Sequence, residues 1–266
     1  MKIFQELTDK IVVITGGSSG LGEQIAYEAA AKGAIVVVCA RRIQLIGKVE
    51  QRCMEISGKE AYAFQLNVAE PDDIEEVSQK ILTEVGVPDV LVNCAGFGLF
   101  EDFLSVDMAA AYRMFEVNVL GMMVLTQKMA IEMAEKGAGH IINVASMAGK
   151  MATAKSTLYS ATKFAVLGFS NALRIELKPL NIGVTTVNPG PIRTEFFDQA
   201  DPSGDYLSSV DWVVLDPEKL ARQIVKKMGT TTREINKPEL LEVAARFYTL
   251  FPHIGDFLAG SLFNKK

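Results

Sequence analysis

The sequence predicts an α/β protein with a single doubly wound parallel sheet and helices on both of its faces. Short aliphatic runs alternate about six times with longer segments of helical periodicity. The runs are apolar on successive residues, as in parallel strands that are buried on both faces. No internal repeat, low-complexity tract or linker divides the 266 residues, so we expect one domain over 1–266.

The runs have the length of strands, and the segments between them have the pattern of helices. LGEQIAYEAAAKG (21–33) carries apolar side chains at helical spacing, and Gly33 is placed to end that helix in the left-handed conformation. The expected strands are IVVIT at 11–15, AIVVVCA at 34–40, AYAFQL at 61–66, PDVLVN at 88–93, HIINVA at 140–145 and IGVTTVN at 182–188. The stretch from Pro189 to about Asp216 is irregular and unusually long for a compact domain, and we expect it to cover a substrate.

Composition and charge argue against several classes of function. The net charge is −5 and no basic run exceeds two residues, so nucleic-acid binding is not expected. The N-terminal MKIFQELTDK has charges on both sides of a very short apolar patch, which fits neither a signal peptide nor a transmembrane segment. The three cysteines show no C-x-x-C spacing and no nearby histidine, which predicts no metal site and a reducing, cytoplasmic compartment.

A glycine-rich turn, TGGSSGLG (15–22), joins the first strand to the first helix. Glycines let a backbone turn tightly and approach a phosphate, and a helix N-terminus offers free N–H groups and a positive dipole end. We therefore expect a nucleotide here, although a turn without a ligand is the alternative. The expected contacts are Gly16, Ser18, Ser19, Gly20, Leu21 and Gly22.

The end of the second strand predicts which nucleotide binds. A cofactor with a free ribose 2′-hydroxyl usually meets an acidic residue about 20 residues past the glycines. Here Ala40 takes that place, and Arg41 and Arg42 follow it. A guanidinium can bind a 2′-phosphate with two parallel hydrogen bonds, so we expect NADP(H) rather than NAD(H). Two arginines that only solvate a strand end are the alternative.

LYSATKFA (158–165) places a tyrosine and a lysine four residues apart. On a helix, Tyr159 and Lys163 project from one face, one turn apart. Free tyrosine has a pKa of about 10, too high to exchange a proton easily at neutral pH, and a nearby ammonium lowers that pKa. Tyr159 would then donate a proton to a carbonyl oxygen that the strand-end hydroxyl of Ser146 also holds. An amphipathic surface pair is the alternative.

Six motifs together resemble the short-chain dehydrogenase/reductase family, from about residue 9 to 235. They are TGGSSGLG (15–22), NCAG (93–96), EVNV (116–119), INVAS (142–146), YSATK (159–163) and PGPIRT (189–194). The resemblance implies a Rossmann-type fold, hydride transfer with a nicotinamide cofactor, and the catalytic residues Asn118, Ser146, Tyr159 and Lys163. It also implies that Lys163 binds the nicotinamide ribose and that Asn118 holds a water that feeds protons to the lysine.

Other cofactor contacts follow from the same resemblance. The segment that lines the cofactor beside the sheet corresponds to Asn93, Ala95 and Gly96. The loop that holds the nicotinamide carboxamide corresponds to Pro189, Gly190, Ile192 and Thr194. Asn67 and Val68 stand where the family usually has Asp-Val against the adenine, and an asparagine oxygen can still accept from the adenine amine.

The residues expected around the substrate are apolar, which favours a hydrophobic or extended ketone or aldehyde. They are Met147, Met151, Phe196, Phe197, Tyr206 and Trp212. The leading hypothesis is an NADPH-dependent oxidoreductase that reduces this carbonyl reversibly to the alcohol. A catalytically silent NADP(H)-sensing regulatory protein on the same fold is the alternative. An isomerase or epimerase is a weaker one, because such relatives generally have an extra substrate domain.

The C-terminal segment, 237–266, departs most from the family. It lacks the Gly-Gly-type tail that helps family members assemble tetramers, and Pro252 breaks its helical pattern of apolar residues. Charged residues interrupt it too often for a membrane span. The open roles are, in order, a cover for the substrate pocket, part of a dimer interface, and contact with a membrane surface. We expect a homo-oligomer, a dimer or tetramer, which by resemblance pairs through helices around 110–136 and 157–177.

Overall fold

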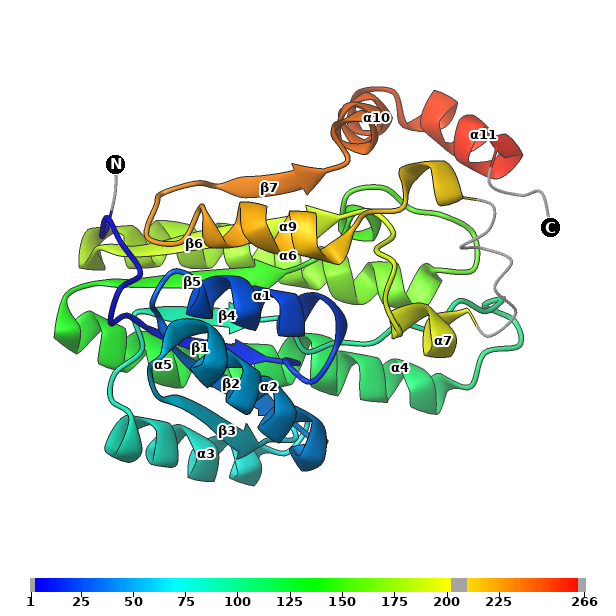
Figure 1. The fold of residues 1–266 in the computed structure, drawn as a ribbon. Helices are drawn as coiled ribbons and strands as arrows, with labels where there is room; N and C mark the ends of the chain where they lie inside the picture. Colours follow the sequence, from blue (N-terminus) through cyan, green and yellow to red (C-terminus); the bar gives the residue numbers. More distant parts are fainter. Residues whose placement is uncertain (1–2, 202–209, 263–266) are drawn as a thin grey trace.

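A parallel sheet of seven strands organises the part of the chain that the computed structural model describes, residues 3–201 and 210–262 (Figure 1). The strand order is β3-β2-β1-β4-β5-β6-β7. The strands are β1 (Ile11–Thr15), β2 (Ile35–Ala40), β3 (Ala61–Gln65), β4 (Val90–Asn93), β5 (Gly139–Val144), β6 (Ile182–Pro189) and β7 (Glu234–Lys237). This sheet confirms the predicted doubly wound α/β class.

Helices follow most of the strands in the chain. The α-helices are α1 (Gly20–Ala30), α2 (Ile43–Ser57), α3 (Pro71–Glu84), α4 (Met108–Phe115), α5 (Met122–Lys136), α6 (Thr157–Leu177), α7 (Phe196–Ala200), α9 (Pro217–Val225), α10 (Glu239–Leu250) and α11 (Pro252–Leu262). A π-helical turn, η1 (Glu116–Gly121), joins α4 to α5. Short 3-10 turns are η2 (Met147–Gly149), η3 (Lys178–Leu180) and η4 (Asp211–Val213).

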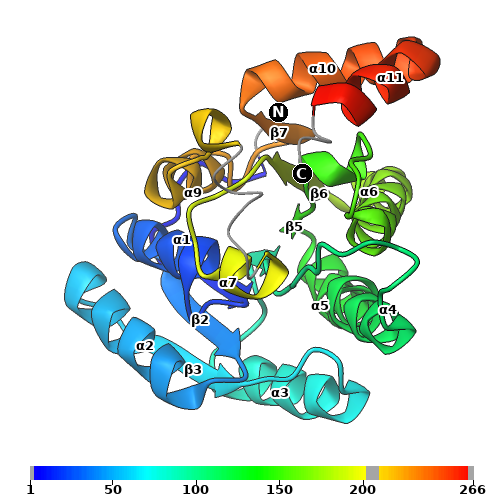
Figure 2. The same cartoon turned by 90° about the vertical axis from the view of Figure 1, so that its right-hand side faces the viewer.

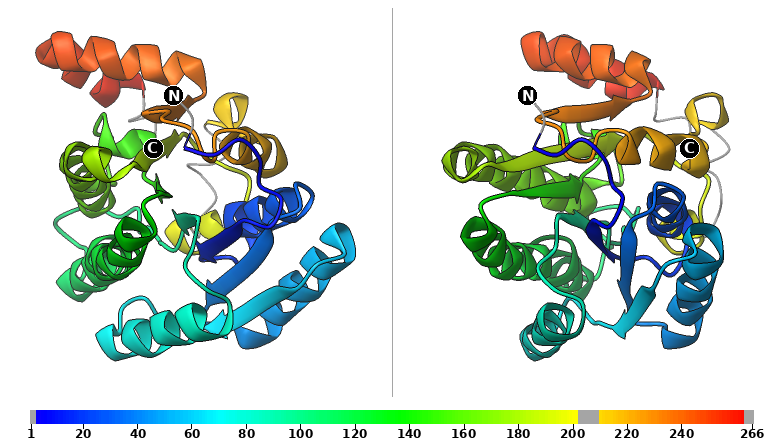
Figure 3. Two further views of the ribbon diagram at one scale, coloured as in Figure 1. Left: turned by 90° about the vertical axis from the view of Figure 1, so that its left-hand side faces the viewer. Right: turned by 60° about the vertical axis from the view of Figure 1, so that its left-hand side comes forward.

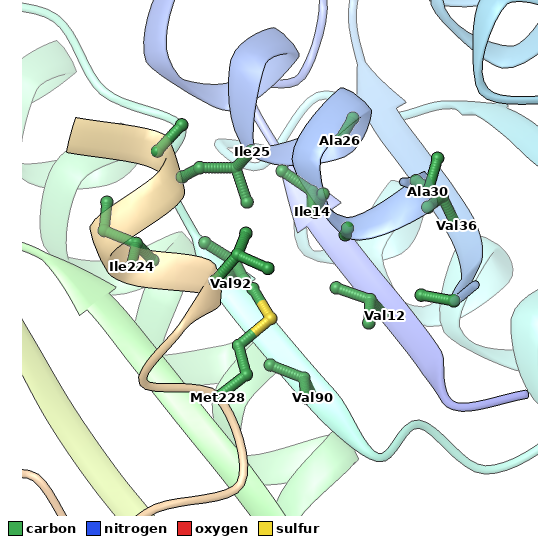
Figure 4. Close-up of a cluster of buried hydrophobic side chains, with 14 of the residues drawn as sticks. Val12, Ile14, Ile25, Ala26, Ala30, Val36, Val90, Val92, Ile224 and Met228 are labelled. Carbon is green, nitrogen blue, oxygen red and sulfur yellow. The ribbon is translucent and has the colours of Figure 1, made fainter. Parts of the chain in front are cut away.

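Both faces of the sheet are covered by helices (Figure 2). On one face α1, α2 and α9 pack against alternate strand residues, and Figure 4 shows Ile25 of α1 and Ile224 of α9 among strand residues that include Ile14 and Val92. On the other face α3, α5 and α6 pack against the intervening residues, among them Val13. Successive side chains of a strand point to opposite faces, so both sets must be apolar. This requirement explains the continuous aliphatic runs in the sequence.

The sheet has a seventh strand that the sequence pattern did not predict. β7 reads EINK, in which Ile235 alone is aliphatic, and it forms an edge by pairing with β6 from Thr186↔Glu234 to Pro189↔Lys237. Half-polar edge strands lack the apolar run that marks a buried strand. The expected irregular stretch from 189 to 216 also contains a helix, α7, beside the segment 202–209 outside the described residues.

The strand order determines where a ligand-binding crevice opens in the sheet. β1 pairs with β2 on one side and with β4 on the other, so the chain leaves their carboxyl ends in opposite directions. A crevice opens at such a point, and ligands of open α/β sheets bind there. The hydroxyl of Thr15, at the end of β1, accepts hydrogen bonds from the backbone N–H groups of Cys94 and Ala95 after β4. This contact holds the two loops side by side.

The helical stretch Met108–Lys136 is long and apolar enough to cross a membrane by length and composition alone. It nevertheless lies against the sheet, and 44% of its most apolar window is buried within the described residues. Leu125, Met129 and Met133 of α5 belong to the core under β4 and β5. We therefore assign this stretch as a core helix of the domain.

After β7 the chain adds two helices that pack against each other, α10 and α11 (Figure 3). The hydroxyl of Tyr248 on α10 donates to Asp256 on α11, and a Cβ on Gly255 would lie 2.4 Å from the Tyr248 ring. Pro252 begins α11, which agrees with the predicted break in the helical pattern. The pair covers the β7 edge of the molecule.

His140 on β5 is fully buried near the amino edge of the sheet, opposite the crevice. The Gly229 N–H donates to its Nδ1 atom at 3.0 Å, so the ring proton lies on Nε2, 2.9 Å from the Thr185 hydroxyl. A second proton, on Nδ1, would point at the Gly229 N–H. Burial lowers the pKa of His140 to about 4.

We predict that the protein loses stability on acidification from pH 6.5 to about pH 4. In this range the unfolded chain binds a proton at His140 that the folded protein excludes, which costs at most about 1.4 kcal/mol per pH unit. Below that range both states are protonated and the loss stops growing. Urea unfolding of the protein and of His140→Gln at several pH values measures the effect. Gln keeps one donor and one acceptor without titrating, so an equally steep loss in the variant would contradict the prediction.

Candidate active site

The glycine-rich turn after β1 is built for close backbone contact. Gly16 and Gly20 have φ of 68° and 59°, in the left-handed region that favours glycine. A Cβ on Gly22 would lie 2.4 Å from the Gly16 carbonyl oxygen, so a larger residue would push the helix away from the turn. The first turn of α1 therefore presents its N–H groups at the crevice, where an anionic phosphate fits.

Arg42 lies over this turn. Its Nη2 atom donates to the hydroxyls of Ser18 at 3.0 Å and Ser19 at 2.8 Å. Its Nη1 atom lies 3.6 Å from a carboxylate oxygen of Glu195, on the loop after β6. Arg41 also lines the cavity and is exposed. A guanidinium held beside two serine hydroxyls is a donor set that suits a phosphate ester.

The adjoining wall lies at the end of β3. Asn67 and Val68 line the cavity, as the resemblance implies. The Asn67 Oδ1 atom accepts a hydrogen bond from the Ala69 N–H, and the Asn67 N–H faces an Asp73 oxygen at 3.3 Å. Asparagine at this position therefore keeps the local turn closed, and its side-chain oxygen is partly committed to that turn.

Asn93 does not line the cavity with its neighbours. Its side-chain amide donates to Thr126 and Asn143, both buried below the floor of the site. The other three residues of the NCAG motif, Cys94, Ala95 and Gly96, do reach the cavity. Asn93 thus ties β4 to β5 and α5 and supports the floor. Burial raises the pKa of the Cys94 thiol to about 11, so that thiol is neutral at physiological pH.

Asn118 lies in the π-helical turn η1, where the side chain points toward the loop after β4. Its Oδ1 accepts from the Phe97 N–H at 3.0 Å, and its Nδ2 donates to the Phe97 carbonyl at 2.8 Å and to Thr162. Single π-helical turns often occur at functional sites because they redirect side chains. Gly121 ends this turn against the wall of the site, where a Cβ would lie 1.7 Å from the Val68 carbonyl oxygen.

Tyr159 and Lys163 project from one face of α6, as predicted, and both line the cavity. The Lys163 ammonium lies 5.6 Å from the centre of the Tyr159 ring and donates to the Val144 carbonyl oxygen at 3.0 Å. The side chain has 6% exposure, and its burial lowers the pKa of Lys163 to about 8. A positive charge beside a phenol is the arrangement that favours the phenolate.

Ser146 follows β5 and lines the same cavity. Its hydroxyl accepts a hydrogen bond from the Ala148 N–H, which caps η2, and faces the Pro189 carbonyl oxygen at 3.4 Å. The contact with Pro189 is long for a hydroxyl donor. The proton of the Ser146 hydroxyl is therefore available to a ligand oxygen.

The loop after β6 closes the cavity from the other side. Pro189, Gly190, Ile192 and Thr194 all line it, and Thr194 lies against Gly20 of the glycine-rich turn. The ring of Phe196, on α7, packs 5.7 Å from the ring of Tyr159. The loop thus connects the glycine-rich turn to Tyr159.

The lined cavity has a volume of about 450 Å³, and many of its lining side chains are apolar. Met147, Met151, Phe196, Phe197 and Trp212 lie there as expected, whereas Tyr206 falls outside the described residues. Phe97, Phe100 and Leu241 are among the apolar lining residues that were not expected from the sequence. Phe97 and Phe100 directly follow the NCAG motif, which was a usable signal; Leu241 lies on the distant helix α10.

Across residues 3–201 and 210–262, no group of three or more His, Cys, Asp or Glu side chains is placed to hold a metal ion. The cavity instead fits a dinucleotide. Its backbone cradle, the Arg42 guanidinium and the Tyr159–Lys163 pair lie around one continuous space. The fold and site together define an oxidoreductase with a nicotinamide cofactor.

The chain belongs to the short-chain dehydrogenase/reductase family. A family model described as short chain dehydrogenase matches residues 10–203. The chain is 33% identical over 232 residues to dehydrogenase/reductase SDR family protein 7-like of Drosophila melanogaster, covering 85% of this chain and 71% of that protein. It is 34% identical over 222 residues to 3-ketodihydrosphingosine reductase of Bos taurus, covering 81% of this chain and 67% of that protein.

A solved structure has the same fold. The short-chain dehydrogenase from Sphingobium yanoikuyae in complex with NADPH matches with a TM-score of 0.78 and 26% identity, and the match covers 94% of this chain and 95% of that one. The family resemblance in the six motifs is therefore confirmed at the level of both sequence and fold.

We predict that Lys163→Met abolishes turnover but stabilises the fold at neutral pH. The folded pKa of Lys163 is about 8, against 10.5 for an ordinary lysine, so the native protein holds an unfavourable buried charge below pH 8. Removing that charge adds at most about 3 kcal/mol to the free energy of unfolding, less the lost hydrogen bond to Val144.

Thermal and urea unfolding at pH 7 and at pH 10.5 measure this effect. The gain should shrink as the pH rises from 8 to 10.5, because the native lysine then loses its charge without mutation. Lys80→Met, at an exposed pair on α3, is the matched control. A variant that is destabilised equally at both pH values would contradict the prediction.

Proposed function

We propose that this protein is an NADPH-dependent carbonyl reductase that converts an apolar or extended ketone or aldehyde reversibly to the alcohol. The observation that carries the proposal is the buried Lys163 ammonium beside Tyr159, in the same cavity as Ser146 and the glycine-rich turn. A protein that only sensed the cofactor would need no tyrosine proton donor beside this ammonium, whose burial costs stability.

The side chains divide the proton chemistry among them. The cofactor, when bound, supplies the hydride that the carbonyl carbon accepts. Tyr159 donates its phenolic proton to the carbonyl oxygen, which yields the alcohol, and the Ser146 hydroxyl holds that oxygen. The Lys163 charge favours the phenolate that remains. Asn118 holds the Phe97 backbone and Thr162 in place next to Lys163. We also propose, from the family resemblance, that Asn118 holds a water that feeds protons to Lys163.

The preference for NADPH is supported by Arg42 and by a related structure. The Arg42 guanidinium lies at the end of β2 against Ser18 and Ser19, and Ala40 stands where an acidic side chain would repel a 2′-phosphate. The structure from Sphingobium yanoikuyae contains NADPH. In the bound state, the 2′-phosphate would take hydrogen bonds from Arg42 and these hydroxyls.

The substrate class is supported by the lining of the cavity and by a relative. Thioether and aromatic side chains line the cavity that contains Ser146 and Tyr159, together with a few polar ones, Thr153, Ser156 and Gln199. Apolar walls with a few polar groups suit a substrate with an apolar chain. The Bos taurus relative is named as a reductase of a 3-keto compound, 3-ketodihydrosphingosine.

We also propose a homo-oligomer in the cytoplasm. Tyr112 of α4, Leu120 of the π-helical turn, and Phe164 and Ile175 of α6 are exposed. A second copy that covered them would remove apolar surface from water. The three cysteines are free thiols, as expected in a reducing compartment.

We predict that Tyr159→Phe reduces kcat by at least about a thousandfold with little change in NADPH affinity, because the ring remains but the proton donor is lost. NADPH consumption is measured against ketones and aldehydes of graded length and polarity. Tyr248→Phe, which removes a hydroxyl bonded to Asp256 on the C-terminal helices, is the matched control. Equal turnover by Tyr159→Phe would overturn the mechanism, and silence of the unmodified protein with tight NADPH binding would indicate a cofactor sensor.

We predict that Arg42→Gln weakens NADPH binding by about ten- to a hundredfold and leaves NADH binding nearly unchanged. The lost charged hydrogen bonds act only on the 2′-phosphate. Fluorescence titration with both cofactors measures this, with Arg52→Gln on the exposed side of α2 as the control. NADH bound as tightly as NADPH by the unmodified protein would refute the cofactor assignment.

A further inference from the structure

Helix α10 of the C-terminal extension forms a wall of the active site. Its Leu241 side chain lines the cavity together with Ser146 and Tyr159 and has 9% exposure. A Cβ on Gly190 would lie 2.9 Å from the Leu241 Cδ1 atom, so the helix also touches the turn that follows β6. A residue some fifty positions beyond the PGPIRT motif thus reaches the reacting end of the site.

An apolar contact joins α10 to the turn that follows Ser146. Met147, Leu241 and Ala245 form a buried cluster, with Met151 packed against it. On its other side this turn, η2, lies against α6, where a Cβ on Gly149 would be 2.7 Å from the Lys163 carbonyl oxygen. The turn is therefore held between the catalytic helix and α10.

Two ion pairs fix this arrangement. The Lys150 Nζ atom, four residues after Ser146, lies 2.5 Å from a Glu234 oxygen on β7 and 3.0 Å from a Glu242 oxygen on α10. The side chains of Lys150, Glu234 and Glu242 are 17%, 21% and 14% exposed. Ion pairs shielded from solvent to this degree are screened less by salt than surface pairs. Glu242 also pairs with Arg246 and Glu234 with Arg233, so loss of the lysine would leave each carboxylate a partner but would remove the link between β7, η2 and α10.

We propose that Leu241 is a specificity-determining residue that limits the size of the apolar substituent on the carbonyl, and that Lys150 is the positioning residue that holds it there. The proposal rests on the proposed carbonyl reductase activity. The substrate class follows from the wall itself: Leu241, Met147 and Met151 present only hydrocarbon and thioether groups to the substituent. A charged or strongly polar substituent would be left without partners there.

The first test changes the volume of the side chain at position 241. Leu241→Ala should raise kcat/KM for the bulkiest accepted carbonyl, relative to the smallest, by about tenfold or more, since a few methylene groups of pocket space have this effect on selectivity. Leu241→Phe should shift the ratio in the opposite direction. Val243→Ala, at a side chain of the same helix with 64% exposure, is the matched control and should leave the ratio unchanged.

The second test removes the ion pairs of Lys150 with Glu234 and Glu242. Lys150→Met should make the backbone amides of α10 exchange with deuterium about tenfold faster and move the substrate-size ratio toward that of Leu241→Ala. Lys80→Met on α3 should do neither. Exchange is measured on the full chain by mass spectrometry, so this readout requires no substrate.

The outcomes distinguish a failure of the proposed carbonyl reductase activity from a failure of the roles given to Leu241 and Lys150. If the unmodified protein reduces carbonyls but Leu241→Ala and Leu241→Phe keep its size ratio, the specificity role is wrong. If α10 exchange in Lys150→Met equals that of the control, the anchoring role is wrong. If no carbonyl is reduced at all, the proposed function fails and the specificity role with it, while the exchange result still decides the anchoring.

Discussion

The burial of one ammonium group is the constraint on which the active site depends. Lys163 keeps a positive charge at 6% exposure, where burial lowers its pKa to about 8. A buried charge needs a partner, and here the partners are the Val144 carbonyl oxygen and the face of the Tyr159 ring. A Cβ on Gly96 would lie 3.6 Å from the Lys163 Nζ atom, so the glycine keeps space open beside the charge. The buried charge costs stability, and in the proposed mechanism it favours the phenolate of Tyr159.

The parallel sheet makes this burial possible. Because every strand in the sheet runs the same way, the carboxyl ends of β1, β4, β5 and β6 meet at one edge, and each supplies a loop to the same cavity. Short polar contacts then join these loops: Thr15 binds the backbone after β4, and Asn118 binds the Phe97 backbone from the π-helical turn. Deeper down, Asn93, Asn143 and Ser170 form a hydrogen-bonded chain beneath the site. These hydrogen bonds link β4, β5 and α6, while the buried Asn93 Oδ1 atom has no hydrogen-bond partner among the described residues.

Features that depend on local spacing could be predicted from the sequence. The strands buried on both faces, the turn at 15–22 and the Tyr159–Lys163 pair each follow from residues close together in the chain. Features that depend on long-range pairing could not. β7 is a strand because it pairs with β6, and its own residues are half polar. Asn93 sits within a family motif, but its side chain turns away from the cavity because a buried threonine and asparagine lie on the other side.

In the C-terminal extension, too, local features could be predicted from the sequence and long-range contacts could not. Its helical pattern and the break at Pro252 are visible in the sequence, whereas the contact of Leu241 with the cavity requires α10 to be folded back over η2. Of the three roles left open for this segment, a wall of the substrate pocket has structural support in the contacts of Leu241 and Lys150. The apolar side chains of Leu250 on α10 and Phe257 on α11 are exposed.

Titration of the Lys163 ammonium shows whether its charge is buried, and it needs neither substrate nor cofactor. Lysine labelled with ¹³C at Cε is followed by NMR from pH 6 to pH 11, and Lys163→Met identifies the signal. We expect a midpoint near pH 8, well below the 10.5 of an ordinary lysine. A midpoint near 10.5 would place the ammonium in water and contradict a buried charge that prepares Tyr159 for proton transfer.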